Sequence, residues 1–287
     1  LISEMQAQMT SRRGVKVVPM LELLQDFSTR HASGAAADYV GFGLEVLATI
    51  PALRTRQGTP ADHVLNKPMS AYSEAFRVLR RALSTSGRQA AQVIAITSTL
   101  PGEGKTTSAL SLGRIMGLAG QKVLVIDADL RRAGLRTATG VQAEAGLVEV
   151  LHGEVPVTQA IIADVAANVD LLPVAANHFS PEDLFSGDGM VNLIERLRPA
   201  YQQIIIDTPP LLGVADARTL CAMADAVLLA VKWNATPRSA VKTSLEWLNH
   251  DKAPLVGAIY TMVDTNSEAS SALYYSGQYA KYYTPDK

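Results

Sequence analysis

The sequence contains almost no cysteine and no long apolar segment. Cys221 is the single cysteine, so an internal disulfide and the cluster ligands of a nitrogenase-type iron–sulfur reductase are excluded. It lies among apolar residues, which favours a buried small side chain over a nucleophile. The scattered histidines show no zinc-binding spacing. No apolar run reaches the roughly 18 residues of a membrane-spanning helix, and no signal peptide is evident, so we expect neither.

The sequence also lacks an excess of positive or negative charge. The 26 basic and 27 acidic residues nearly cancel, and nothing in this balance indicates a nucleic-acid partner. With 48% hydrophobic and 18% charged residues, the chain has the composition of a soluble α/β protein. Its 287 residues allow one sizeable domain with extensions, or two small domains. The first residue is Leu1 rather than Met. A removed initiator and a piece of a longer protein both explain this.

A phosphate-binding loop is the most informative feature that is present. Residues 99–107 read T-L-P-G-E-G-K-T-T, between a short apolar run and a stretch with helical character. Backbone N–H groups of such a loop form an anion site, and the following helix adds its dipole. The lysine can reach the β- and γ-phosphates of ATP, and the next hydroxyl can ligate Mg²⁺. The expected ATP-binding residues are Pro101, Gly102, Glu103, Gly104, Lys105, Thr106 and Thr107.

The loop departs from the usual pattern at its first position. Thr99 stands where the first glycine of G-x-x-x-x-G-K-[ST] is expected, and Pro101-Gly102 supplies the tight turn instead. A chance match to G-K-T in an ordinary loop is the alternative. The strand before it and the helix after it argue against that alternative.

Strands and helices alternate from about residue 67 to residue 265. Apolar runs and helical periodicity predict strands at 92–97, 122–127, 169–174, 203–207, 226–232 and 255–261, and helices at 70–84, 105–119, 145–152, 157–163, 188–198 and 237–250. Continuous apolar strands indicate a parallel sheet covered by helices on both faces, as in P-loop NTPases. Residues 1–66 are predicted to be an N-terminal linker segment, and residues 266–287 a flexible tail.

Acidic residues end two of the predicted strands. Asp207 follows an I-I-I run, and Asp127 and Asp129 follow V-L-V-I. At the carboxyl edge of a parallel sheet, beside a phosphate loop, such carboxylates can ligate Mg²⁺ or take a proton from an attacking hydroxyl. Capping of the next turn by Asp207, and pairing of the other two acids with Arg131 or Arg132, are the alternatives.

Two further patterns point to contacts between molecules. Glu74, Arg77 and Arg80 share one face of the helix predicted at 70–84, which is either a solvated charged face or a subunit contact. Tyrosines crowd the C-terminal end without the aliphatic neighbours of a core. They are a sticky aromatic tail, or phosphate acceptors that enter another molecule's active site. The tyrosines are Tyr274, Tyr275, Tyr279, Tyr282 and Tyr283.

Together these motifs resemble the bacterial tyrosine kinases of exopolysaccharide and capsule assembly. E-A-F-R-V-L-R resembles the family's oligomerisation motif, P-G-E-G-K-T its Walker A motif, V-I-D-A-D-L-R its Walker A′ motif and I-I-I-D-T-P-P its Walker B motif. L-A-T-I-P at 47–51 looks like the segment that follows the second membrane helix in fused members, so residues 1–66 would be juxtamembrane. The family shares its fold with septum-positioning and plasmid-partitioning ATPases.

The resemblance implies roles for these residues. Lys105 would stabilise the transferring phosphoryl group, Thr106 and Asp207 would hold Mg²⁺, and Asp127 and Asp129 would share metal binding and activation of the tyrosine. The terminal tyrosines would be phosphorylated by a neighbouring subunit in a ring closed through Glu74, Arg77 and Arg80. It also implies a membrane polysaccharide co-polymerase as activator, a cognate tyrosine phosphatase, and a cytoplasmic position at the inner face of the plasma membrane.

The chain departs from the family after its last predicted strand. Members often carry L-N-R-V-D there, with the asparagine near the adenine, whereas this chain has Thr261 at that position. Two other functions stay open. A positioning ATPase would carry a lysine where Leu100 stands and would lack the tyrosine cluster. A non-catalytic, ATP-binding scaffold of the export machinery is the other.

Overall fold

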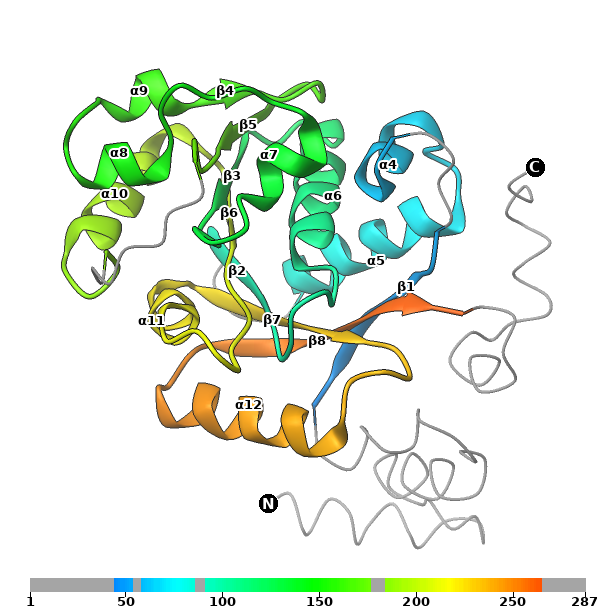
Figure 1. The fold of residues 1–287 in the computed structure, drawn as a ribbon. Coiled ribbons are helices and arrows are strands. Elements are labelled where there is room, and N and C mark those ends of the chain that lie inside the picture. Colours follow the sequence, from blue (N-terminus) through cyan, green and yellow to red (C-terminus); the bar gives the residue numbers. More distant parts are fainter. Residues whose placement is uncertain (1–43, 54–57, 86–90, 177–183, 265–287) are drawn as a thin grey trace, which may run out of the picture.

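The computed structural model describes residues 44–53, 58–85, 91–176 and 184–264. They form an eight-stranded sheet with helices on both faces (Figure 1). The strand order is β1-β8-β7-β2-β6-β3-β5-β4, and every neighbouring pair is parallel except β4 with β5. The predicted fold class is confirmed.

The strands are β1 (Val46–Pro51), β2 (Val93–Ser98), β3 (Val123–Asp127), β4 (Ile162–Ala163), β5 (Val169–Leu172), β6 (Gln203–Asp207), β7 (Ala226–Lys232) and β8 (Leu255–Val263). The helices are η1 (Pro60–Asp62), α4 (His63–Asn66), α5 (Ala71–Thr85), α6 (Lys105–Leu118), α7 (Gly134–Thr139), α8 (Leu147–Leu151), α9 (Val157–Ala160), α10 (Gly189–Leu197), η2 (Arg198–Ala200), α11 (Asp216–Met223) and α12 (Arg238–His250).

Successive residues of the central strands enter two separate cores. In β2, Val93 and Ala95 pack with α8, α10, α11 and α12, whereas Ile94 and Ile96 pack with α4, α5 and α6. All residues of β2, β3 and β6 are buried. This two-sided burial is why these strands read as continuous apolar runs rather than as an alternation.

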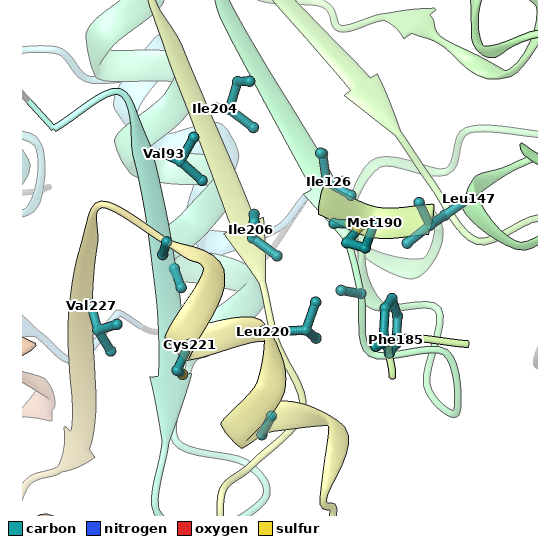
Figure 2. Close-up of a cluster of buried hydrophobic side chains, with 14 of the residues drawn as sticks. Val93, Ile126, Leu147, Phe185, Met190, Ile204, Ile206, Leu220, Cys221 and Val227 are labelled. Carbon is teal, nitrogen blue, oxygen red and sulfur yellow. The ribbon is translucent and has the colours of Figure 1, made fainter. Parts of the chain in front are cut away.

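The first of these cores joins parts of the chain that are distant in sequence (Figure 2). Phe185 lies beside Met190 of α10 and Leu147 of α8, while Leu220 and Cys221 of α11 face the central strands. Cys221 is fully buried, and this burial raises the pKa of its thiol to about 12. The prediction of a buried cysteine is confirmed.

Helix α6 approaches the sheet closely because it carries two glycines on its inner face. A Cβ atom added to Gly113 would lie 2.8 Å from Cγ2 of Val125, and one added to Gly117 would lie 2.5 Å from Cγ2 of Val169. Both distances are shorter than real Cβ contacts. The glycines therefore set how deep α6 sits, and with it the position of the loop at its N-terminus.

The sheet begins earlier than the predicted domain boundary at residues 66/67. Strand β1 pairs in parallel with β8, and the N–H of Ala52 donates to the carbonyl of Val263 at 2.9 Å. The segment 46–51 is thus part of the sheet domain, not of a separate linker. The prediction also missed η1, α4, α7 and α11, and it extended a helix over the residues of β4.

Among the described residues, every helix is too short or too polar to span a lipid bilayer. The predicted flexible tail and its tyrosines lie outside the described residues, as does most of the predicted linker.

Candidate functional site

The phosphate loop has the strand–loop–helix setting that the sequence predicted. It leaves β2 after Ser98 and enters α6 at Lys105. Gly102 has φ +81° and Gly104 has φ +82°, a left-handed conformation that glycine adopts without strain. Lys105 is the first residue of the helix and is only 6% exposed, so its charge is held within the site.

The strand order brings the predicted acids to the same edge of the sheet. Strand β6 lies between β2 and β3, and Asp127 at the end of β3 is the register partner of Asp207 at the end of β6. Asp207 is also the register partner of Ile96 in β2. The two carboxylates therefore meet beside the strand that leads into the phosphate loop.

Asp127 is held by the backbone that follows it. Its carboxylate accepts hydrogen bonds from the N–H of Leu135 at 2.9 Å and from the N–H of Asp129 at 3.2 Å. Burial raises the pKa of Asp127 to about 7, and the charge of Asp129 adds to this, while the two backbone bonds and Lys105 oppose it. The group is therefore fixed in place and titrates near neutral pH.

Asp207 has no such backbone partners. Within the described residues, neither of its carboxylate oxygens has a hydrogen-bond partner, and the side chain is fully buried. Burial raises its pKa well above the ordinary value, and the charge of Asp127 adds to this; Lys105 and the nearby Thr106 hydroxyl oppose it. Thr106 packs against the start of α7, since its Oγ1 lies 2.7 Å from where a Cβ of Gly134 would be.

Asp129 lies just beyond β3 and is 5% exposed. Burial raises its pKa, and Lys105, Arg132 and Arg131 oppose the shift. Lys105 acts electrostatically on Asp127, Asp129 and Asp207 alike. The structure thus brings together the four residues that the sequence proposed as catalytic.

These residues fit Mg²⁺ when nucleotide phosphates complete the coordination. In the described part of the chain, no three carboxylate, histidine or cysteine side chains form a metal cage by themselves. Mg²⁺ differs from most metals in needing only one or two carboxylates together with phosphate oxygens and water. The unpartnered oxygens of Asp207, near the Thr106 hydroxyl, are the atoms that such an ion would satisfy.

Thr261 does not stand free for contact with a base. It is 3% exposed, and its hydroxyl donates to the carbonyl of Glu103 at 2.8 Å. Thr236, which the sequence reasoning did not single out, donates to the carboxylate of Glu103. In the sequence, Thr236 is a single threonine before a proline, and nothing in this pattern predicts a contact with Glu103. The contact arises only when the sheet folds.

The charged face of α5 is present as predicted. Phe76, Leu79 and Leu83 face the core, as the sequence indicated. Glu74 pairs with Arg77 of the same chain at 2.6 Å. Arg80 is half-buried, and its Nε atom has no hydrogen-bond partner among the residues that the structure describes. The proposed phosphate acceptors lie outside the described residues.

Comparisons with known proteins identify the family of the chain. A family model described as an AAA domain matches residues 91–250, which include the phosphate loop and all three acids. The tyrosine-protein kinase YwqD of Bacillus subtilis is 35% identical over 213 residues, which are 72% of this chain and 90% of YwqD. The chain belongs to the bacterial tyrosine-protein kinases.

Other similar proteins differ from this chain in length. The solved kinase domain of the Escherichia coli tyrosine kinase Etk superposes with a TM-score of 0.75 at 28% identity, covering 83% of this chain and 97% of the Etk domain. The succinoglycan biosynthesis transport protein ExoP of Rhizobium meliloti is 32% identical over 230 residues, which are 77% of this chain but 29% of ExoP. The chain spans about a third or less of the length of several curated relatives.

Proposed function

We propose that this chain is an ATP-dependent protein-tyrosine kinase that transfers the γ-phosphate of ATP to tyrosines in the C-terminal region of a second copy of the chain. The observation that carries the proposal is the convergence of Lys105, Asp127, Asp129 and Asp207 at the end of the phosphate loop. Hydrolysis by a positioning ATPase and transfer to a phenol both need a group that takes the proton of the attacking hydroxyl, so these residues support phosphoryl transfer in general. Membership of the tyrosine-protein kinase family favours a tyrosine as the acceptor.

Each residue has a distinct part in the transfer. The N–H groups of the loop and the Lys105 ammonium bind the phosphates and stabilise the charge that builds up on them. Asp127 or Asp129 accepts the proton of the tyrosine hydroxyl as its oxygen attacks. The pKa of about 7 for Asp127 suits this role, because a base works best near the pH at which it operates.

Thr106 and Asp207 would hold Mg²⁺ against the phosphates. When bound, the ion would neutralise negative charge on the phosphates. Lys105 lowers the pKa of Asp207 in the absence of the ion and so keeps the carboxylate closer to its charged, ligating form.

Helix α5 would join the subunits of a ring. Val78 on α5 is 49% exposed and Met69 just before it is 71% exposed, so apolar surface lies next to the charged face. In a ring, Glu74 would exchange Arg77 of its own chain for an arginine of the neighbour. We expect Glu74→Arg to reduce the oligomer, and the double variant Glu74→Arg, Arg77→Glu to restore it, as measured by light scattering after size exclusion. Equal oligomerisation of all three chains would contradict this interface.

The biological setting is proposed from the names of the relatives. ExoP is named for succinoglycan biosynthesis and transport. By this likeness the kinase would control polymerisation and export of an exopolysaccharide or capsule from the inner face of the plasma membrane. A membrane polysaccharide co-polymerase would activate it, and a cognate tyrosine phosphatase would reverse it.

Incubation with Mg²⁺ and ATP, with and without the membrane co-polymerase as activator, followed by detection of phosphotyrosine, tests the activity against its alternatives. The kinase becomes labelled on tyrosine, and the Lys105→Met variant does not. A positioning ATPase would hydrolyse ATP without labelling itself, and a scaffold would bind ATP and do neither. Either of those results with the parent chain would overturn the proposal.

A further inference from the structure

Glu103 puts a negative charge into a loop that is shaped to bind phosphates. A carboxylate facing the anion site would weaken it, because like charges repel strongly where water is excluded. The side chain is only 2% exposed, although the residue lies at the tip of a loop between two glycines. The carboxylate is therefore turned into the protein.

Two donors hold the carboxylate there. One oxygen, Oε2, accepts from the N–H of Leu100 at 2.8 Å, which closes the loop on itself. The other, Oε1, accepts from the hydroxyl of Thr236 in the connection between β7 and α12. The loop after β2 is thus tied to the end of the neighbouring strand.

The backbone of Glu103 is anchored independently. Its carbonyl accepts from the hydroxyl of Thr261 near the end of β8, at 2.8 Å. The carbonyl of Glu103 and the N–H of Gly104 belong to one planar trans peptide and point in opposite directions. The bond between this carbonyl and Thr261 therefore turns the N–H of Gly104 away from β8. Gly104 lies next to Thr261, since a Cβ on it would be 3.6 Å from Cβ of Thr261, an ordinary van der Waals contact.

We propose that Glu103 is a positioning residue which, through Thr236 and Thr261, holds the phosphate loop in its nucleotide-binding shape before the nucleotide arrives. The inference rests on the proposed function, because it takes a nucleoside triphosphate as the ligand of the loop. A preformed site loses less conformational entropy on binding. The anchor therefore contributes mainly to nucleotide affinity and much less to the rate of phosphoryl transfer from bound ATP.

The hydroxyl of Thr236 can be removed without a change in side-chain size. Thr236→Val leaves one buried carboxylate oxygen without its donor, and Thr236→Ser keeps the donor. Thr243→Val is the matched control, because within the described residues the hydroxyl that it deletes bonds only to the carbonyl of Ser239 in α12. Titration with Mg-ADP should give a dissociation constant about tenfold higher for Thr236→Val, the effect of losing one hydrogen bond to a charged group. Thr236→Ser and the control should match the parent.

A second pair of variants tests the same anchor from the other side. Glu103→Gln keeps a carbonyl for Leu100 and an amide that the Thr236 hydroxyl can accept from, whereas Glu103→Ala loses both contacts. The glutamine variant should bind Mg-ADP within about threefold of the parent, and the alanine variant at least tenfold more weakly.

The readouts separate this inference from the proposed function. Binding of Mg-ADP requires no tyrosine transfer, so the ranking of dissociation constants stands even if the parent never labels a tyrosine. Labelling at saturating Mg-ATP should stay within about twofold of the parent in Thr236→Val. Parent-like affinity in both Thr236→Val and Glu103→Ala, or equal loss in the serine and valine variants, would overturn the positioning role.

Discussion

Asp127 and Asp207 are buried side by side, and this raises the free energy of their charged forms. Burial is the main cause in both cases, and the charge of Asp127 also raises the pKa of Asp207. Lys105 compensates only in part. The site is therefore less stable when its acids are charged and nothing binds them, which is a common property of sites built to hold a cation.

The contribution of Asp127 to the stability of the nucleotide-free and metal-free protein should therefore fall as the pH rises from about 4 to about 7. Asp127 has an ordinary pKa of 3.8 when unfolded and a pKa of about 7 when folded, so only the folded state keeps its proton in this window. This contribution to the unfolding free energy is fully present below the pKa that Asp127 has in the unfolded chain. It is lost as the pH rises through the pKa that Asp127 has in the folded protein.

Urea titrations at about pH 5 and about pH 8 measure this effect. Asp127→Asn should reduce the difference in unfolding free energy between the two pH values, by an amount on the order of a few kcal/mol. An unchanged difference in the variant would show that the raised pKa of Asp127 does not govern the pH dependence.

Two features hold helix α6 in place against the sheet. Gly113 and Gly117 let it lie close to the sheet, and Arg114 between them is 1% exposed. Arg114 donates to both oxygens of Asp164, at 2.8 and 2.9 Å, and to Asp62 at 2.8 Å. These contacts fasten the helix of the phosphate loop to the residues after β4 and to η1.

Gly117→Ala should destabilise the fold by roughly 1–3 kcal/mol, because the new methyl group would overlap Val169 and the carbonyl of Ala167. Gly187→Ala is the control, since an added Cβ there meets no atom within 4 Å. Chemical denaturation compares the two variants. Equal stability would show that α6 can shift outward without cost.

Arg114→Leu should cost roughly 3–5 kcal/mol of unfolding free energy, because it leaves the carboxylate of Asp164 buried without its partner. The matched control is Arg218→Leu, whose ion pair with Asp251 lies near the surface and should contribute at most about 1 kcal/mol. Similar losses from both substitutions, measured by the same denaturation, would contradict the structural role of Arg114.

The central strands could be predicted because their apolar runs are a local signal. β2, β3 and β6 are buried on both faces, and their sequences show it. β1 could not be predicted in this way, because it ends in a proline and its place depends on pairing with β8 at the far end of the chain. The short helix α7, which follows Ala133 at φ +46°, also lacks a local signal.

The site as a whole combines residues from several strand ends. The sequence predicted the phosphate loop and the acids because each follows a recognisable strand. It could not predict Thr236 as a partner of Glu103, since that contact depends on β7 lying next to β2. Nor could it show that Thr261 serves the loop rather than a base.

Transfer between two copies of the chain is the central claim, and a mixing experiment tests it directly. Lys105→Met chains, which keep their tyrosines, are mixed with chains whose terminal tyrosines are replaced by phenylalanine, in the presence of Mg²⁺ and ATP. The replaced residues are Tyr274, Tyr275, Tyr279, Tyr282 and Tyr283. Mass spectrometry then locates the phosphate. We predict phosphotyrosine at these positions of the Lys105→Met chain in the mixture, and none there when either chain is incubated alone. Transfer between molecules would be contradicted if the Lys105→Met chain stayed unphosphorylated in this mixture while the parent chain, incubated separately, phosphorylated itself.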